Sequence, residues 1–166
     1  MGWLDGRTAR MVGTSPVIAT ALTTQGATLV ADGDCDVLVH VAPPPLVKLA
    51  HALSHAEWRA TLDAGLDQCF LLAKDFASAR RAVGKAGAVV FVSAPEQTLG
   101  ADQAAAAGAL GNLTKTLGVE WARDGIRVNA VQTTANDATL GNLVAYLASD
   151  YAAYVTGAVM GVGLDD

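Results

Sequence analysis

Six short apolar segments, separated by helical patterns, constrain the fold of this chain more than any other feature. Each is rich in Val, Ala or Ile and is bounded by turn residues. They cover residues 9–13, 27–32, 36–42, 86–94, 125–132 and 157–163. Continuous apolar runs of this length are typical of parallel strands that are buried on both faces.

Amphipathic helical patterns fill the intervals between these segments. They cover residues 15–26, 55–84, 101–125 and 138–150. The first begins with Ser15 as an N-cap and Pro16 at the first helical position, and it ends at Gly26. In the second, we expect Trp58, Leu62, Leu66, Phe70 and Ala73 to form the buried face. Alternation of strands and helices predicts one α/β domain over 1–166, a doubly wound, Rossmann-like parallel sheet of about six strands.

Composition limits the function classes. The chain has 166 residues, of which 52% are hydrophobic and 16% charged, and this favours a single folded domain. A net charge of −5 without any basic run excludes a nucleic-acid partner, and no apolar run is long enough to span a membrane. The N-terminus has no long apolar core, so we expect no signal peptide and a cytoplasmic protein, with Cys35 and Cys69 as reduced, buried thiols.

Four stretches of the sequence together resemble the short-chain dehydrogenase/reductase family. "DVLVHVA" and "AVVFVSA" are similar to two of its strands, and the latter resembles the strand that carries the catalytic serine. "LTKTLGVEWARDGIRVNAV" and "YLASDYAAYVTGAVMGV" are the more specific matches, to the family's helix and strand pairs near the C-terminus. The resemblance implies a Rossmann-type fold, a nicotinamide cofactor and a Ser-Tyr-Lys apparatus assisted by an Asn.

The family's catalytic positions carry other residues in this chain. Alignment of the flanking residues puts Gln103 at the tyrosine position and Ala107 at the lysine position. Ala94 takes the serine position, and we expect Ser93, one residue earlier, to point away from the cleft. Gly65 falls at or near the asparagine position. Gln cannot ionise, so it cannot replace a phenol as proton donor, and we expect no catalytic residue among these four.

The cofactor turn of the family is degenerate as well. Dinucleotide binding needs a glycine-rich turn between the first strand and the first helix. Here Gly13 is retained, but Val17 and Ala19 place side chains where a phosphate must approach. Pro16 lacks the amide hydrogen that would donate to it, and Pro43 replaces a glycine on the adenosine side. We therefore expect no cofactor.

Two parts of the family's fold are shortened. The resemblance implies a further strand–helix unit between about residues 33 and 36, and a substrate-covering lid near 132–138. Only short connections stand at these places.

The family's assembly elements are retained. Its two long helices form a four-helix bundle with those of a neighbouring subunit, which here implies helices 55–84 and 101–125. On the second of these, Ala105, Ala109, Asn112 and Thr116 form an uncharged outer stripe that we expect to be an interface. The alternative is that alanine is simply the best helix former and that this stripe faces solvent.

Three functional hypotheses follow. The first is a catalytically inactive subunit that assembles with an active short-chain dehydrogenase, most simply as a heterotetramer, or that self-associates through its two long helices. The resemblance places the partner among NAD(P)-dependent dehydrogenases or ketoreductases that act on hydroxyacyl thioesters, ketones or steroid-type substrates. The second is an oxidoreductase rewired around His40, Gln103 or Asp137 in the old cleft, and the third is a small-ligand binder there.

No metal site is predicted. His51 and His55 are four residues apart with Glu57 near them, but no third ligand has a matching spacing. Asp32, Asp34 and Asp36 lack the glycine and glutamate of a calcium loop, so we expect them to form a solvated turn.

Overall fold

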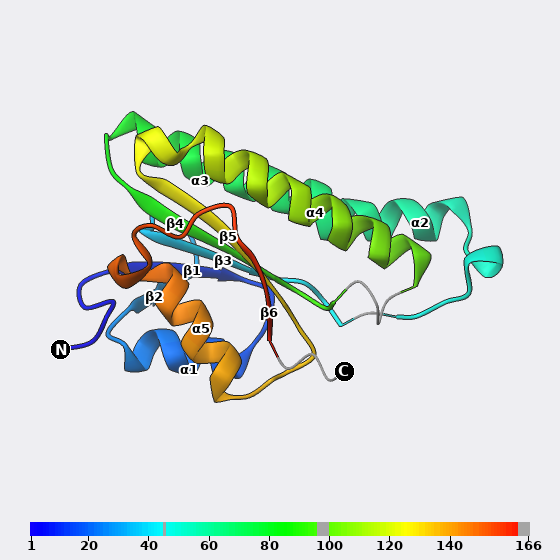
Figure 1. Ribbon diagram of the computed structural model, residues 1–166, viewed down its shortest axis with the longest axis horizontal. Helices are drawn as coiled ribbons and strands as arrows, with labels where there is room; N and C mark the ends of the chain where they lie inside the picture. The colour runs from blue at the N-terminus through cyan, green and yellow to red at the C-terminus, as the bar shows by residue number, and fades with distance from the viewer. Residues whose placement is uncertain (45, 96–99, 163–166) are drawn as a thin grey trace.

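A single parallel sheet organises the molecule. The computed structural model describes residues 1–44, 46–95 and 100–162 (Figure 1). Its sheet has six strands in the order β2-β1-β3-β4-β5-β6, all neighbours being parallel. The strands are β1 (Thr8–Val12), β2 (Thr28–Val30), β3 (Val37–Val41), β4 (Gly87–Ser93), β5 (Ile126–Thr133) and β6 (Val159–Val162). The predicted Rossmann-like sheet is confirmed.

Helices cover both faces of this sheet. One face is covered by α1 (Pro16–Thr24) and α5 (Ala138–Ala148) (Figure 1). The other face is covered by α3 (Gln68–Ala82) and α4 (Ala101–Glu120), and α2 (His55–Leu62) packs against α4 beyond the end of the strands. Two hydrophobic clusters, one on each face, form the core, and Val90 and Phe91 of β4 belong to opposite clusters. This alternation is the two-residue periodicity of a strand that is buried on both sides.

Local chemistry sets the ends of the helices. The Ser15 hydroxyl accepts a hydrogen bond from the amide of Ile18 and Pro16 occupies the first helical position, as predicted. The second helix begins with a capping box, in which Ser54 accepts from the Glu57 amide and the Glu57 carboxylate accepts from the Ser54 amide. The fourth ends before a 3-10 turn that Gly125 closes in the left-handed conformation, with φ of 70°.

The helix predicted over 55–84 contains a π-helical turn, η2 (Asp63–Asp67), between α2 and α3. A π turn adds a residue to the helical repeat and rotates everything that follows it. Ala73 is buried and Leu66 packs against the core as predicted, but Phe70 is 41% exposed and Cys69 and Phe76 face the sheet. The prediction was wrong for Phe70, because it assumed an unbroken period of 3.6 residues.

The connection from β2 to β3 has no helix. β2 ends at Val30, opposite Arg10, and β3 begins at Val37, opposite Ala9, on the other side of β1. Residues 31–36 therefore take the chain past β1, where a parallel crossover ordinarily uses a dozen or more residues. We call residues 31–36 the short crossover. Its Cys35 is buried in the hydrophobic cluster beneath α3.

A buried arginine of α3 holds the short crossover in place. Arg80 is 3% exposed, and its Nε donates to the carbonyl of Ala86 at 2.9 Å. Its Nη1 donates to the carbonyl of Cys35 at 3.3 Å and lies 3.4 Å from the Asp34 carboxylate, and Nη2 donates to Asp36 Oδ1 at 2.9 Å. One guanidinium thus joins a helix, the short crossover and the segment that leads into β4.

Asp36 extends this contact to β1. Its Oδ2 accepts hydrogen bonds from the amide and the hydroxyl of Thr8, at 2.9 and 3.1 Å. Burial works to raise the pKa of Asp36, but the Thr8 hydrogen bonds and the positive charge of Arg80 outweigh it and leave the pKa below its ordinary value. The carboxylate therefore stays ionised beside the guanidinium.

We predict that Arg80→Met lowers the free energy of unfolding by about 3 kcal/mol, because it removes one partner of a buried ion pair. The matched control is Arg81→Met on the same helix. Arg81 pairs with Asp124 at 3.1 Å, but its side chain is 55% exposed, so we expect a loss below about 1 kcal/mol. Urea denaturation at pH 7.5 measures both. Equal losses would contradict the role given to Arg80.

Candidate functional site

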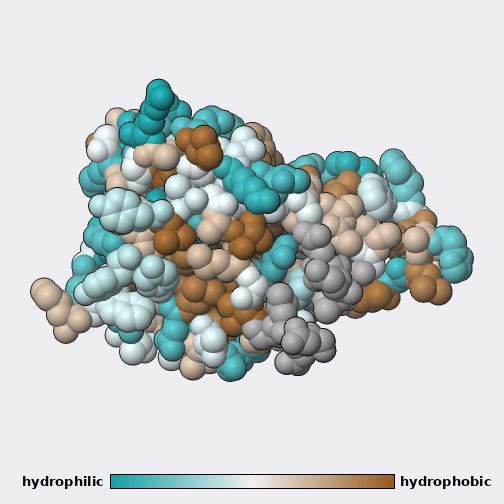
Figure 2. All heavy atoms as spheres, in the orientation of Figure 1, coloured by the Kyte–Doolittle hydropathy of each residue, from teal (hydrophilic) through white to brown (hydrophobic). Residues whose placement is uncertain are grey.

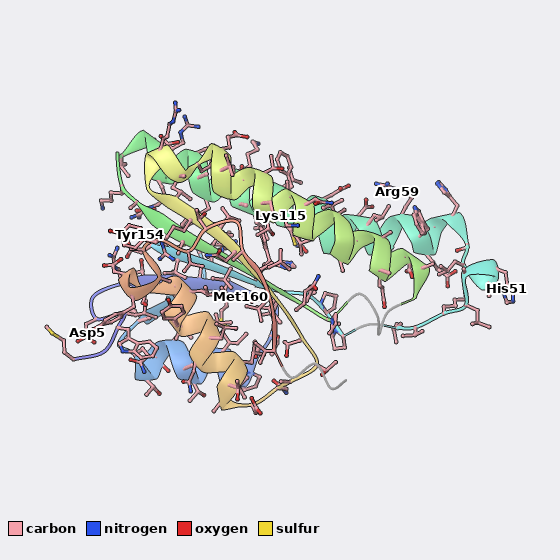
Figure 3. All side chains as sticks on the ribbon, in the orientation of Figure 1. Asp5, His51, Arg59, Lys115, Tyr154 and Met160 are labelled. Carbon is pink, nitrogen blue, oxygen red and sulfur yellow. The ribbon has the colours of Figure 1, made fainter. Side chains whose placement is uncertain are left out.

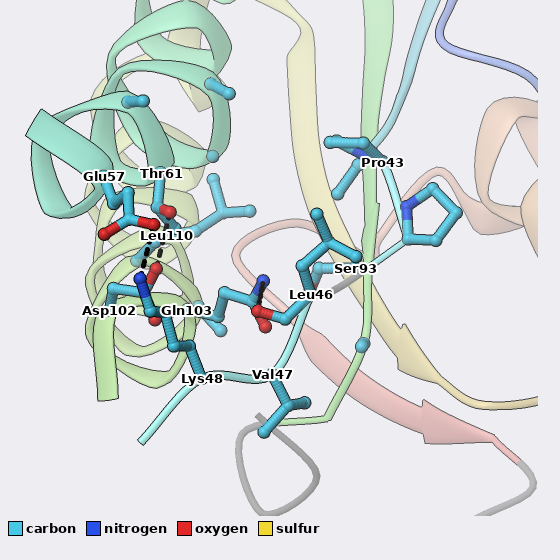
Figure 4. Close-up of a pocket in the computed structure, with 18 of the residues that line it drawn as sticks. Pro43, Leu46, Val47, Lys48, Glu57, Thr61, Ser93, Asp102, Gln103 and Leu110 are labelled. Atoms are coloured by element: carbon cyan, nitrogen blue, oxygen red, sulfur yellow. Dashed lines mark hydrogen bonds and ion pairs between the residues drawn. The ribbon is translucent and has the colours of Figure 1, made fainter. Parts of the chain in front are cut away.

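A cavity of about 590 Å³ opens at the carboxyl ends of β3 and β4 (Figure 4). One wall is the segment that follows β3, residues 42–48 without the undescribed residue 45, which we call the strap. The other walls are α2, η2 and α4. The lining residues are Ala42, Pro43, Pro44, Leu46, Val47, Lys48, Leu53, Glu57, Ala60, Thr61, Ala64, Gly65, Ser93, Ala94, Asp102, Gln103, Ala106, Ala107 and Leu110. In parallel α/β sheets, this edge is where ligands bind.

The structure brings all four residues at the family's catalytic positions to this cavity. Ala94 follows β4, and Gln103 and Ala107 lie one turn apart on α4. Gly65 lies in η2, where a Cβ atom would stand 3.2 Å from the Cβ of Ala106. The missing side chain lets α4 approach the π turn closely. Three segments distant in the sequence thus meet around one space.

Three ionisable side chains line the cavity, and each has a partner. Lys48 Nζ lies 2.7 Å from Glu57 Oε1, and Asp102 accepts a hydrogen bond from the Thr61 hydroxyl at 2.6 Å. The hydrogen bond from Lys48, followed by those from Ser54, lowers the pKa of Glu57 to about 2. Glu57 is therefore a fixed anion and cannot act as a proton donor near neutral pH. Sequence reasoning missed Asp102 as a lining residue, although it directly precedes Gln103.

Ser93 also lines the cavity, contrary to the expectation that it points away. Val89 and Phe91 of β4 pack on the α3 and α4 side, so Ser93, two residues further, faces that same side. Because β4 ends at Ser93, strict alternation does not extend to Ala94, and both residues reach the space. Among the described residues, the Ser93 hydroxyl has no hydrogen-bond partner.

Gln103 fastens the strap to α4. Its Nε2 donates to the carbonyl of Leu46 at 3.3 Å, and its Oε1 is buried without a partner in the described part of the chain. With the Lys48–Glu57 ion pair, this bond gives the strap two attachments, one to each helix beside the cavity. The residue at the family's tyrosine position thus makes a structural contact.

The residues of the rewired-enzyme hypothesis do not meet. His40 is 2% exposed and its Nδ1 lies 3.3 Å from the Sγ of Cys69, beneath α3. Asp137 is the N-cap of α5, where its Oδ1 accepts from the Thr139 amide at 2.9 Å. Neither residue lines the cavity with Gln103. Burial lowers the pKa of His40, and it raises the pKa of Cys69 to about 12, so this pair is neutral near pH 7.

The turn after β1 does not fit a dinucleotide pyrophosphate. Gly13 has φ of 91°, and a Cβ there would collide with the Val41 carbonyl oxygen, so this glycine serves the close approach of β1 to β3. The Ile18 amide already donates to Ser15, and Pro16 has none to offer. Val17 and Ala19 are half-buried on α1, and neither lines the cavity.

None of the remaining candidate residues lines the cavity. His51 and His55 are exposed, and no group of three metal-ligating side chains occurs in the part of the chain that the structure describes. Asp32 pairs with Arg10 at 3.5 Å, and Cys35 and Cys69 are both free and buried. In the described part of the chain, no helix has the length and apolar character needed to cross a bilayer.

Comparisons with known proteins agree with this architecture. The family described as enoyl-(acyl carrier protein) reductase matches residues 18–140. A cis-4-hydroxycyclohexanecarboxylate dehydrogenase of Sinomonas cyclohexanicum is 32% identical over 163 residues. The chain belongs to the short-chain dehydrogenase/reductase family. The alignment covers 78% of this chain and 65% of that dehydrogenase, so the chain spans about two thirds of the relative's length.

Solved structures of the family superpose closely. A gluconate 5-dehydrogenase from Beutenbergia cavernae, described as NAD(P)-dependent and with bound NADP, matches with a TM-score of 0.84 at 26% identity, over 96% of each chain. A short-chain dehydrogenase/reductase from Mycobacterium marinum matches with a TM-score of 0.87 at 19% identity, over 96% of this chain and 94% of that one. The fold of this chain is thus that of the family.

We predict that stability falls as the pH drops below about 6.5, the ordinary value for an unfolded histidine. Because burial lowers the pKa of His40, the unfolded chain binds a proton at a higher pH than the folded chain does. Stability is therefore full above that pH and is lost below it, by at most about 1.4 kcal/mol per pH unit for one proton. Urea denaturation between pH 7.5 and 5.5 measures the slope.

The variant His40→Gln should flatten this slope, whereas His55→Gln, at an exposed position, should leave it unchanged. A slope that persists in His40→Gln would show that another group is responsible.

Proposed function

We propose that this chain is a non-catalytic member of the short-chain dehydrogenase/reductase family. It would assemble in the cytoplasm with an active, NAD(P)-dependent dehydrogenase or ketoreductase, most simply as a heterotetramer. The observation that carries the proposal is the cavity itself: its four family positions hold Ala94, Gln103, Ala107 and Gly65, and none of these can donate or accept a proton at neutral pH.

Among the described residues no tyrosine lines the cavity, and Lys48 is the one lysine that does. Tyr146 is in α5, and Tyr151 and Tyr154 follow it in the chain; Figure 3 shows Tyr154 at the end of the molecule away from His51. Lys115 lies in the middle of α4, two turns beyond Ala107, and does not line the cavity (Figure 3). Lys48 lines it, but is bound to Glu57.

The outer surfaces of the long helices support assembly. Ala105, Asn112 and Thr116 are exposed and Ala109 is half-buried, so the proposed interface stripe is free in the single chain. Large apolar side chains are exposed on the same helices: Phe70, Leu71 and Val119. Exposed apolar groups of this size favour a covering partner over solvent.

The partner's substrate class follows from the family resemblance and from the relative's name. We place it among hydroxyacyl thioesters, ketones and steroid-type alcohols, and the name of the Sinomonas relative adds alicyclic hydroxy acids.

We predict that the purified chain binds neither NADH nor NADPH. Isothermal titration to millimolar cofactor should give no saturable heat, because Pro16 has no amide hydrogen, the Ile18 amide already donates to Ser15, and Val17 places a side chain where the pyrophosphate must approach. An active relative of the family, titrated alongside, is the positive control. Saturable binding of either cofactor would contradict the proposal.

We also predict that Ala109→Arg on α4 separates the chain from its dehydrogenase partner in co-purification, because an interface of small side chains cannot hold a buried, unpaired cation. Thr24→Arg, at an exposed position of α1, is the control and should co-purify normally. Retention of the partner by Ala109→Arg would exclude this stripe as the interface.

A further inference from the structure

We propose that the 590 Å³ cavity is a binding site for a neutral, largely apolar small molecule with one hydrogen-bonding group, held without any cofactor. This inference rests on the proposed function in one respect: a cavity without reacting groups keeps its ligand unchanged. Binding itself needs neither a partner subunit nor turnover.

The size and walls of the cavity define the bulk of the ligand. A volume of 590 Å³ lies in the range of small-molecule sites, which are mostly apolar with a few placed polar groups. Apolar side chains make up most of the lining residues: the alanines of the strap, α2, η2, α4 and the end of β4, with Pro43, Pro44, Leu46, Val47, Leu53 and Leu110. Ala94 and Ala107 hold only methyl groups at their positions, so the space reaches back to β4 and α4. Displacement of water from such walls favours an apolar occupant.

The charges at the cavity exclude an anionic ligand. Among the described residues that line the cavity, Lys48 is the one positively charged side chain, and its Nζ already lies 2.7 Å from Glu57 Oε1. The remaining charged group, Asp102, is 3% exposed and bound to Thr61. An entering carboxylate would face two carboxylates and no free cation. Complementarity therefore favours a neutral molecule.

The Ser93 hydroxyl is the polar group of the wall that we expect to orient the ligand. Ser93 lines the cavity, and its hydroxyl has no partner among the described residues. Thr61 and Gln103 Nε2 are engaged with Asp102 and Leu46, and the unpartnered oxygens Gln103 Oε1 and Asp102 Oδ1 are themselves buried. A hydroxyl both donates and accepts, so it can pair with an alcohol or a carbonyl oxygen. A single free hydroxyl matches a ligand with a single polar group.

The strap residues at the entrance to the cavity are apolar. Leu46 and Val47 line the cavity and are also 86% and 65% exposed, so they present an apolar rim to an approaching molecule. Figure 2 shows hydrophobic side chains gathered at the end of the molecule where the strap and α2 meet. Gln103 and Lys48 hold this rim in position through their bonds to Leu46 and Glu57.

The test uses 6-propionyl-2-dimethylaminonaphthalene, a neutral naphthalene with one carbonyl group whose emission shifts to the blue in apolar surroundings. Titration of the full chain, without cofactor, should give a saturable blue shift with one site per chain. Ala107→Phe, which fills the cavity from α4, should weaken binding by about tenfold or more. Ala138→Phe, at an exposed position of α5 away from the cavity, is the matched control and should bind normally.

Two further variants and an anionic probe complete the test. If Ala107→Phe does not fold, Ala94→Leu fills the same cavity from the end of β4. Ser93→Ala should weaken binding by about three- to tenfold, the worth of one hydrogen bond. The anion 8-anilinonaphthalene-1-sulfonate should bind more weakly than the neutral probe.

Absence of a saturable shift, equal binding by the Phe variants at 107 and 138, or tighter binding of the anion would each overturn the proposal. These outcomes are separate from the cofactor titration. A chain that binds NADH refutes the proposed function, whereas a chain that binds neither cofactor nor probe refutes only this inference.

Discussion

The guanidinium of Arg80 is the contact on which the N-terminal half of the sheet depends. The short crossover takes the chain from edge strand β2 past β1 to β3 without a helix to cover its backbone. Residues 31–34 are exposed to solvent, and Arg80 bonds the carbonyl of Cys35 and the carboxylate of Asp36 on the crossover and the carbonyl of Ala86 before β4. Asp36 passes the contact on to Thr8 of β1. A buried ion pair is costly to desolvate, and it is stable here because nearly every donor of the guanidinium has an acceptor.

This clamp lies at the amino ends of β1, β3 and β4, the edge of the sheet opposite the cavity. With β3 and β4 aligned in register, their carboxyl ends, the strap and α4 enclose one cavity. The scaffold therefore survives without the reacting groups, as expected when stability resides in the core and chemistry in a few side chains at one edge. Gln103 is one example. It stands at the family's tyrosine position, but its side chain donates a hydrogen bond to the strap instead of reaching a substrate.

Most of the fold could be predicted from the sequence, because strand and helix periods are local properties. All six strands lie within one or two residues of the apolar segments, and the Ser15 cap stands where its side chain indicated. The convergence of Ala94, Gln103, Ala107 and Gly65 followed from the family resemblance. The π turn, which exposes Phe70, could not be predicted, because it is set by packing of η2 against α4. The contacts of Arg80 could not be predicted either, since its partners Asp34 and Asp36 lie more than 40 residues away in sequence.

A shortened scaffold of the family, a cavity with Ala94, Gln103, Ala107 and Gly65 at the catalytic positions, and exposed helix surfaces together support our proposal that this chain works as part of an assembly with an active dehydrogenase. The most direct measurement is the native mass of the complex purified from the cells that make the protein. The account predicts a mass that contains this chain together with a second, longer chain of the same family. A mass equal to this chain alone, or to a multiple of it, would contradict the claim.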